Sequence, residues 1–388
     1  MQTTLKDIFL NQAARSIFLN PKILDSNFIP SELPFRENHA QALAKILAPA
    51  LQGQRPSNVL IYGTPGTGKT IVAKTVLQEL NEAAKTTGAP VKTVYVNTRL
   101  RHMADTEYRL VAQLARLFGA EVPFTGLPLN EVYQVFFAAV DKPGNLIIVL
   151  DEIDHLLSKS GAEVLFNLVS GAQHAQISFI GISSNMTIMD QIDPRVRTKL
   201  SPEELLFPPY DAVQITEILN KRAVAFRPGC LDSSVIPKCS AHAAREHGDA
   251  CRAIELLRIA SEIADRNSEN KVTSMHVDQA SNKLELNKAI GLLQMQPVQC
   301  KLVLYSISQG AKSSGEIYQG YLKLCGQTNT KPLTARRVTD LIAELEMLGM
   351  VNTNLISKGR YGRTTEVELT VAPEARTGLE KYLKAEFG

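Results

Sequence analysis

Short runs of apolar and β-branched residues alternate with amphipathic, helix-like stretches over the first two hundred residues. The runs are residues 58–62, 91–96, 146–150 and 177–182. Strands that alternate with helices predict an α/β fold, in which helices cover a parallel sheet. Asp151 directly follows the third run, so acidic groups are expected at the carboxyl end of a strand, where open α/β sheets bind their ligands.

The spacing of apolar residues changes after residue 210. Over residues 211–284 it is helical throughout, which predicts a small all-helical domain. Residues 285–388 contain three helix-like stretches and then two strand-like ones, a succession typical of a winged helix. Two or three domains also agree with a length of 388 residues. The three helix-like stretches are residues 299–309, 314–324 and 334–348.

A glycine-rich segment follows the first apolar run. Residues 63–70 read Gly-Thr-Pro-Gly-Thr-Gly-Lys-Thr and precede a helix-like stretch. In such a loop the backbone folds tightly around an anion, and unpaired amides at the N-terminus of the new helix point at phosphates. We therefore expect ATP or ADP here, with Lys69 at the β- and γ-phosphates and the Thr70 hydroxyl on Mg²⁺. The residues expected to hold the nucleotide are Pro65, Gly66, Thr67, Gly68, Lys69 and Thr70.

Polar residues after the third and fourth runs supply further groups for ATP hydrolysis. The reaction needs a metal ion, an oriented water molecule and a cation that faces the departing γ-phosphoryl group. We expect Asp151 to hold Mg²⁺ through its water shell and Glu152 to orient and deprotonate the attacking water. The Asn185 amide is expected near the γ-phosphate, although a simple polar turn also explains this position.

Composition and charge narrow the class of protein. The chain is 44% apolar and has neither a long apolar run nor an apolar N-terminal segment, so we expect a soluble cytoplasmic protein without a membrane partner. Its five cysteines lie far apart, which predicts reduced packing residues rather than a zinc site or disulfides. Residues 285–388 contain 13 Lys and Arg against 10 Asp and Glu, so a polyanionic partner is expected to meet this segment.

The winged-helix segment carries outward-facing cations. Apolar residues of 334–348 form one stripe, which leaves two arginines and a threonine at the start of the helix to face outward. Arginines in that position suit guanine edges or phosphates in a major groove. A thin basic hairpin tip at 360–363 suits a minor groove. A winged helix that serves only protein contacts is the alternative. The expected DNA contacts are Arg336, Arg337, Thr339, Arg360, Tyr361 and Arg363.

These motifs together resemble those of the AAA+ ATPases. The Walker A loop is residues 63–70, the Walker B strand is residues 146–152, and the sensor-1 residue is Asn185, followed by a helical lid. Five further segments, in their order, narrow the resemblance to the archaeal origin-recognition and cell-division-cycle-six type replication initiators, over nearly the whole chain. These segments are Leu33–Glu37, Asp193–Arg197, Phe207–Asp211, Gly248–Ala253 and Gly359–Thr364.

The resemblance implies further residues of the nucleotide site. Tyr210 and Arg222 from the lid should complete the pocket, with Tyr210 near the base. The sensor-2 arginine of the family falls where this chain has Cys251, and an arginine follows one step later at Arg252. One helical residue is a turn of about 100°, so Arg252 would reach the γ-phosphate from a different face. Slow or defective hydrolysis is therefore expected.

The resemblance implies two further functions. For each, the sequence indicates the segment but does not identify the residue that acts. One is the arginine that acts on the nucleotide of a neighbouring molecule, for which Arg195 is preferred and Arg197 and Lys199 stay as alternatives. The other is a DNA contact from a helical insertion after the second strand, at residues 97–127. The candidates in that insertion are Arg99, Arg101 and Thr125, against the alternative of a solvated loop.

The resemblance implies an ATP-dependent DNA replication initiator. We predict a nucleotide-binding domain at 1–210, a helical lid at 211–284 and a DNA-binding winged helix at 285–388. The protein would bind double-stranded origin DNA at the nucleoid, together with paralogous initiator subunits, and promote loading of the replicative minichromosome maintenance helicase. Slow ATP hydrolysis would act as a switch. The alternatives are a clamp-loader-like or remodelling ATPase, a signalling ATPase whose winged helix serves protein contacts, and a transcription regulator.

Overall fold

The computed structural model describes nine stretches of the chain. They are residues 15–25, 28–30, 32–99, 104–123, 126–140, 144–171, 175–357, 363–371 and 373–387. The chain divides into two compact units, one formed by Ser16–Arg258 and the other chiefly by Ile259–Gly388.

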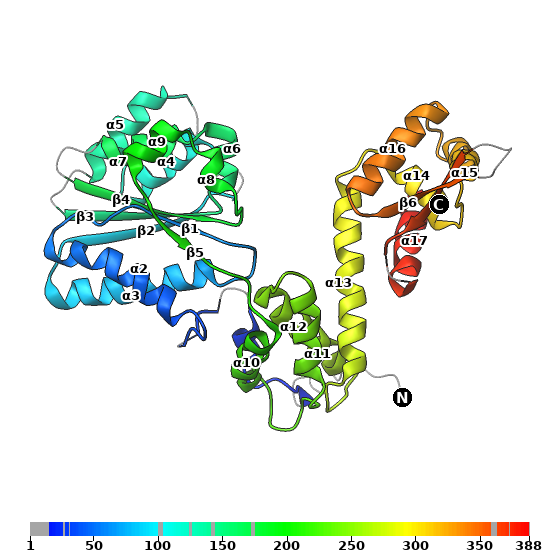
Figure 1. Ribbon diagram of the computed structural model, residues 1–388, viewed down its shortest axis with the longest axis horizontal. Helices are drawn as coiled ribbons and strands as arrows, with labels where there is room; N and C mark the ends of the chain where they lie inside the picture. Colours follow the sequence, from blue (N-terminus) through cyan, green and yellow to red (C-terminus); the bar gives the residue numbers. More distant parts are fainter. Residues whose placement is uncertain are drawn as a thin grey trace. The chain divides into compact units, whose positions relative to one another are not determined.

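The first unit is built around a five-stranded parallel sheet (Figure 1). In sequence order its strands are β1 (Val59–Tyr62), β2 (Val91–Asn97), β3 (Gly144–Asp151), β4 (Ala175–Ser183) and β5 (Glu203–Leu206). Their order across the sheet is β2-β3-β4-β1-β5, which confirms the predicted α/β class and its four strands. The sequence did not predict β5, because this short edge strand is mostly exposed and begins with two glutamates.

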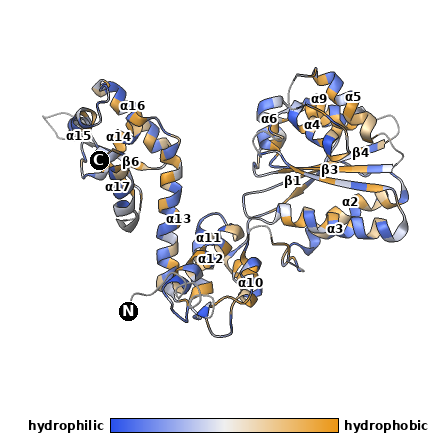
Figure 2. Cartoon of the chain, turned by 180° about the vertical axis from the view of Figure 1, so that it is seen from behind, coloured by the Kyte–Doolittle hydropathy of each residue, from blue (hydrophilic) through white to orange (hydrophobic). Residues whose placement is uncertain are grey.

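Helices cover both faces of the sheet (Figure 1). Successive side chains of a strand point to opposite faces of the sheet, so both faces of β3 are apolar and need cover. Ile147 and Val149 pack against one layer of helices, and Ile148 and Leu150 pack against the other. Hydrophobic residues accordingly recur along the strands and on the covering helices (Figure 2). One layer contains α2 (Glu37–Leu47) and α3 (Lys69–Thr87). The other contains α4 (Glu107–Leu117), α5 (Leu129–Val140), α6 (Asp154–Ser160), α7 (Glu163–Ser170), α8 (Ile188–Gln191) and α9 (Pro194–Leu200).

A helical region follows β5 and begins with a capped helix. Asp211 and Gln214 form a capping box at the start of α10, which ends the extended segment after β5 and starts the lid predicted from the sequence. The chain before α2 returns to this region, because the Leu19 amide donates to the Ala225 carbonyl at 2.8 Å. The helices of this region are α10 (Ala212–Arg222), α11 (Val235–Arg245) and α12 (Ala250–Arg266), and it also contains the 3-10 helix η3 (Ala223–Ala225), which contacts η1 (Pro21–Leu24). A third 3-10 helix, η2 (Ala48–Gln52), follows α2 and packs on α2 and α3.

The second unit ends in the predicted winged helix. The antiparallel hairpin of β6 (Val351–Ser357) and β7 (Arg363–Leu369) follows three helices, which confirms the order read from the sequence. A further helix, α17 (Pro373–Phe387), was not predicted; within its described part the buried apolar stripe is short, with Leu379 and Leu383 fully buried. The three helices are α14 (Val298–Ser308), α15 (Ser314–Gln327) and α16 (Ala335–Met347), and the longer helix α13 (Ser274–Gln294) precedes them.

One helix crosses the boundary predicted between the lid and the winged helix. Helix α13 continues through residue 284 without a break, so no loop marks that division. In the part of the chain that the structure describes, none of the helices has the length and apolar character that crossing a membrane requires.

Candidate nucleotide-binding site

The glycine-rich loop joins β1 to α3 and has the backbone of an anion site. Gly66 and Gly68 have φ values of 71° and 89°, in the left-handed region that glycine adopts without strain. Close neighbours also exclude a side chain, since a Cβ at Gly68 would lie 2.8 Å from the Tyr210 hydroxyl oxygen. Gly68 is the N-cap of α3 and offers no side-chain cap. The first amides of α3 therefore remain available to phosphate oxygens.

Lys69 and Thr64 add donors to this loop. The Lys69 ammonium is buried and donates to the Gly63 and Thr64 carbonyls at 2.8 Å each. Burial lowers the pKa of Lys69, while the carboxylates of Glu152 and Asp151 oppose that shift. The Thr64 hydroxyl is buried without a hydrogen-bond partner among the described residues. A buried donor without a partner is costly, so this loop fits a ligand rich in acceptor oxygens, such as a polyphosphate.

Asp151 lies at the carboxyl end of β3 and is 4% exposed. Its Oδ2 accepts hydrogen bonds from the Thr70 hydroxyl at 2.9 Å and from the Tyr95 hydroxyl at 2.5 Å. Its Oδ1 accepts from the backbone amide of Glu152 at 2.9 Å. The structure thus brings the two residues predicted to bind metal, Thr70 and Asp151, into contact. A hydroxyl beside a carboxylate is the hard oxygen donor set that suits Mg²⁺.

Glu152 has a left-handed backbone conformation, with φ of 57°, which non-glycine residues adopt only when neighbours stabilise it. Thr98 supplies that support, because its hydroxyl, placed between the Asp151 and Glu152 carbonyls, lies 3.1 and 2.6 Å from their oxygens. Burial raises the pKa of Glu152, and the Asp151 carboxylate raises it further. A carboxylate of raised basicity beside the loop agrees with the role predicted for Glu152 as a base.

The residue after β4 that lines the cavity is Ser184 rather than Asn185. The Asn185 side-chain oxygen accepts from the amide and the hydroxyl of Thr187, both at 2.9 Å, as in the polar turn that the sequence left open. Asp154 positions the strand end by accepting from the Ser183 hydroxyl at 2.6 Å and the Ser184 amide at 3.2 Å. The expectation that the Asn185 amide reaches the γ-phosphate therefore has no support in this geometry.

Arg36 connects the glycine-rich loop to Tyr210 on the opposite side of the site. Its guanidinium donates to the Thr67 carbonyl at 2.9 Å and also to the Pro208 carbonyl. It lies 4.0 Å from the centre of the Tyr210 ring, a cation–π distance. The Tyr210 side chain, which is 7% exposed, is thereby held against the loop at Gly68. The sequence did not identify Arg36 as a site residue, although its motif was noted, because its partners are distant in sequence.

These walls enclose a cavity of about 600 Å³. Arg222 lines it, donates to the Ile23 carbonyl at 2.5 Å and lies 4.7 Å from the centre of the Phe28 ring. The structure therefore places both lid residues implied by the resemblance, Tyr210 and Arg222, in the cavity wall. The apolar part of the cavity is lined by Ile23, Phe28, Ile29, Leu33, Ile218 and Ile254.

At the start of α12, the position where the resemblance implies an arginine is occupied by a cysteine, Cys251. Cys251 lines the cavity and is solvent-exposed, which corrects the expectation that every cysteine packs in a core. The dense surroundings of the sulfur raise its pKa to about 11, so the thiol is neutral. The Arg252 guanidinium instead pairs with Glu246 at 3.2 Å and Glu255 at 3.5 Å. Arg252 is not among the residues that line the cavity, and its guanidinium is held by these two glutamates.

The three cations considered for action on a neighbouring molecule lie on α9, outside the cavity. Arg197 pairs with Glu204 at 3.1 Å, and the Lys199 ammonium lies 4.5 Å from the centre of the Phe166 ring. Arg195 is exposed, and no described residue forms a hydrogen bond or ion pair with its guanidinium. Of the three, Arg195 is therefore the cation most available to another molecule.

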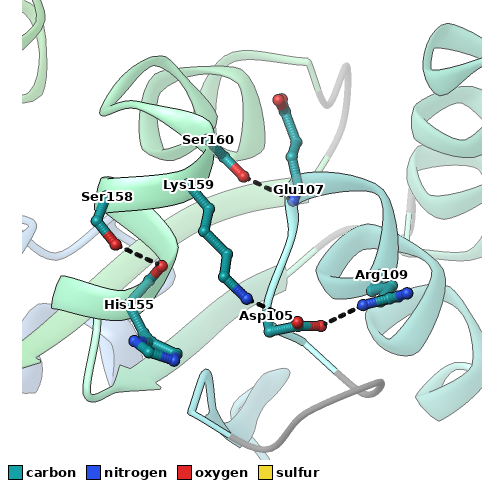
Figure 3. Close-up of polar contacts among 7 residues, drawn as sticks. All are labelled: Asp105, Glu107, Arg109, His155, Ser158, Lys159 and Ser160. Carbon is teal, nitrogen blue, oxygen red and sulfur yellow. Dashed lines mark hydrogen bonds and ion pairs between the residues drawn. The ribbon is translucent and has the colours of Figure 1, made fainter. Parts of the chain in front are cut away.

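An ion cluster centred on the buried Asp105 carboxylate fixes the helix that follows the acidic pair (Figure 3). Asp105 pairs with Lys159 of α6 at 2.9 Å and with Arg109 of α4 at 2.8 Å. Hydrogen bonds from these two cations hold the pKa of Asp105 well below its usual range. Ser160 caps the neighbouring helix by accepting from the Glu107 amide at 3.0 Å. These contacts join α6, which begins two residues after Glu152, to the start of α4 in the segment that the sequence identified as an insertion.

The residues predicted to contact DNA are placed only in part. Arg336, Arg337 and Thr339 are exposed on α16, opposite the predicted stripe of buried Val338 and Leu341. Arg337 pairs with Glu344 at 3.3 Å and Asp340 at 3.6 Å, whereas Arg336 has no such partner among the described residues. In the insertion, Arg99 is exposed. Outside the described residues or side chains lie Arg101, Thr125, Arg360, Tyr361 and Arg363.

Family models match three successive parts of this chain. An AAA ATPase domain matches residues 32–180, the Cdc6 AAA+ ATPase-type lid domain matches residues 216–282, and the CDC6 C-terminal winged helix domain matches residues 291–377. The order agrees with the three domains read from the sequence. An AAA ATPase domain implies nucleotide binding.

Curated relatives match nearly the full length. The ORC1-type DNA replication protein of Pyrococcus abyssi is 44% identical over 384 residues, which covers 95% of this chain and 91% of that relative. The ORC1-type DNA replication protein 1 of Methanosarcina acetivorans is 45% identical over 383 residues, with 95% and 92% covered.

Solved structures agree with these relatives. The Aeropyrum pernix ORC1 protein, solved in complex with DNA, is 41% identical and superposes with a TM-score of 0.78, covering 96% of this chain and 98% of that one. The Aeropyrum pernix ORC2 protein, solved as ADPNP-ADP complexes, is 25% identical with a TM-score of 0.60, covering 96% and 99%. With its AAA ATPase domain, lid and winged helix, this chain belongs to the ORC1-type DNA replication proteins, a family of replication initiators.

Proposed function

We propose that this initiator binds double-stranded origin DNA and, in its ATP-bound state, promotes loading of the replicative minichromosome maintenance helicase. The observation that carries the nucleotide part is the cavity between the loop and the lid. There the Ala250 amide at the start of α12 donates to the Gly66 carbonyl at 3.2 Å. A Cβ at Gly66 would lie 1.7 Å from the Asp249 carboxylate. Because the lid touches the loop itself, a change in the bound phosphates would change how the lid sits.

Each group of the cavity has a separate proposed task. Lys69 and the loop amides would bind the β- and γ-phosphates, and Tyr210 would lie at the base. Thr70 and Asp151 would hold Mg²⁺, which neutralises charge on the phosphate oxygens when it is bound. Glu152 would orient a water molecule and accept its proton. Arg195 of one molecule would approach the γ-phosphate bound by another.

The lid wall supports slow hydrolysis. A neutral thiol at Cys251 stabilises developing negative charge less than a guanidinium would. Arg252 is already paired with two glutamates. We therefore propose that ATP persists long enough to act as a switch that ends when it is hydrolysed.

The DNA part of the proposal rests on α16 and on the relatives. The Aeropyrum pernix ORC1 protein was solved with DNA and is 41% identical to this chain. We propose that α16, the hairpin tip and the insertion contact DNA, with Arg336, Arg337 and Thr339 on α16 and Arg360, Tyr361 and Arg363 at the tip. In the insertion the candidates remain Arg99, Arg101 and Thr125.

The proposal keeps the wider setting expected from the sequence. Paralogous initiator subunits would bind the same origin, and the protein would act on the nucleoid in the cytoplasm. Its working divisions would be residues 1–210, 211–284 and 285–388.

Footprinting on genomic DNA of the host tests this function. With ATP and Mg²⁺ we expect protection of a defined sequence that persists as salt rises, because base contacts resist salt better than phosphate contacts. The double variant Arg336→Ala, Arg363→Ala should weaken that binding by about 1–3 kcal/mol and affect random DNA less. Uniform, salt-sensitive binding with fast ATP turnover would contradict the initiator function and favour a clamp-loader-like ATPase.

A further inference from the structure

We propose that Tyr95 is a positioning residue that holds Asp151 ready for the divalent cation of the nucleotide site. The inference rests on the proposed binding of a nucleotide with Mg²⁺ and adds a residue that no sequence motif marked. Tyr95 lies on β2, the edge strand beside β3, where it pairs in register with Val149. Its hydroxyl extends along the sheet to Asp151, the last residue of β3 in that pairing, and donates to Oδ2 at 2.5 Å.

The bond matters because Asp151 is 96% buried and depends on a small set of donors. In the described part of the chain, three hydrogen bonds reach its carboxylate, from Thr70, Tyr95 and the Glu152 amide. Two of these donors belong to the reactive centre itself. Tyr95 has no proposed role in binding the phosphates or in the attack of water. Its hydroxyl can therefore hold the carboxylate in place throughout.

The Thr70 hydroxyl is expected to serve two partners. The same oxygen that donates to Asp151 Oδ2 at 2.9 Å is the oxygen expected on the cation. Its orientation must therefore suit the metal and the carboxylate at once. A separate donor from Tyr95 keeps Oδ2 in place whatever orientation the Thr70 hydroxyl adopts. Groups that hydrogen-bond metal-binding carboxylates in this way commonly set metal affinity.

The Tyr95 ring is itself fixed. The Lys74 ammonium lies 4.5 Å from the centre of the ring, and the ring packs against the core layer that contains α2 and α3. A tyrosine hydroxyl keeps its proton at neutral pH, so the group can donate to the carboxylate. Phenylalanine would keep the ring contacts and remove only this donor.

The test measures the effect of Mg²⁺ on nucleotide affinity, independently of hydrolysis. Fluorescent mant-ATP is titrated into wild type and Tyr95→Phe, once with EDTA and once with saturating Mg²⁺. We expect affinity in EDTA to agree within about twofold, because the phosphate loop is unchanged. The gain in affinity that Mg²⁺ brings should fall by about tenfold, the lower end of the loss seen for removal of such supporting groups.

A matched control is available on another strand of the same sheet. Tyr62→Phe on β1 also removes a hydroxyl bonded to a carboxylate, that of Glu204 at 3.0 Å, but on an exposed surface away from Asp151. It should leave both affinities unchanged. Thermal unfolding of each variant without nucleotide checks that the sheet is intact, and both midpoints should stay near that of wild type.

The outcomes separate this inference from the proposed function. A Mg²⁺ effect in Tyr95→Phe equal to that of wild type would overturn the positioning role. An equal loss with EDTA and with Mg²⁺ would also overturn it, because Tyr95 would then support the pocket as a whole. A wild-type protein that ignored mant-ATP in both solutions would instead refute the proposed nucleotide function itself.

Discussion

The two walls of the nucleotide cavity are built in different ways. The wall at the strand edge comes from two short segments, residues 65–70 and 151–152, together with Ser184. Neighbours such as Thr98 and Tyr95 fix the acidic segment. The lid wall gathers Arg36, Tyr210, Arg222 and Cys251 from four distant parts of the sequence.

The difference is also chemical. The strand-edge wall contains an ammonium, two carboxylates and free helix amides, so it has the groups that phosphate binding and water activation require. The lid wall ends in a neutral thiol at Cys251, while Arg252 is paired elsewhere. We therefore expect binding and water activation to depend on the strand-edge wall, and the rate of hydrolysis to be limited by the lid wall.

The largest expected effect lies in the strand-edge wall. Glu152→Gln removes the proposed base but keeps the size of the side chain, so ATP hydrolysis should fall by about 10²–10⁴-fold while ATP still binds. Single-turnover hydrolysis and mant-ATP binding, measured on the same preparation, check this. Hydrolysis at the wild-type rate would mean that another group activates the water, and the division of tasks between the walls would be wrong.

In the lid wall, Arg36→Ala should have a smaller but broader effect. It removes the bond to the Thr67 carbonyl and the contact with the Tyr210 ring. Nucleotide affinity should fall by about tenfold and the free energy of unfolding by about 2 kcal/mol, because a buried carbonyl loses its donor. Arg245→Ala, which removes an exposed arginine of the same unit outside the cavity wall, is the control and should change neither. An unchanged affinity would show that Tyr210 needs no such support.

How far the sequence predicted the site follows the same division. The strand-edge wall could be predicted because its residues are consecutive and their geometry is local: a loop with glycines, then a helix N-terminus, then acids after a strand. Ser184 and Tyr95 escaped prediction because only the register of β2, β3 and β4 decides which side chains meet at the sheet edge.

The lid wall was accessible only through the resemblance. Tyr210 and Arg222 were named on that basis, and both line the cavity. No local pattern indicates that Arg36 reaches Thr67, 31 residues away, or that the Arg252 side chain turns to Glu246 and Glu255. Contacts of this kind arise from tertiary packing, which propensity and spacing do not encode. The same limit applies to β5, whose place beside β1 makes it a strand despite its glutamates.

The smallest expected effect comes from a substitution in the lid wall that should make hydrolysis faster rather than slower. Cys251→Arg places a guanidinium at the start of α12, where the thiol now lines the cavity beside Lys69 and Arg222. A cation there should stabilise the charge that develops during hydrolysis, and about 1.4 kcal/mol of such stabilisation corresponds to a tenfold faster rate. Single-turnover hydrolysis with Mg²⁺ measures it.

Two controls decide whether charge is the cause. Cys251→Ser changes the thiol for another neutral group and should leave the rate unchanged, and so should Arg252→Ala, because Arg252 lies outside the cavity wall. If Arg252→Ala slowed hydrolysis, that arginine would swing into the cavity when ATP binds. If Cys251→Arg left the rate at the wild-type value, the neutral lid wall would not be what makes this initiator slow, and the cation from a neighbouring molecule would become the limiting group.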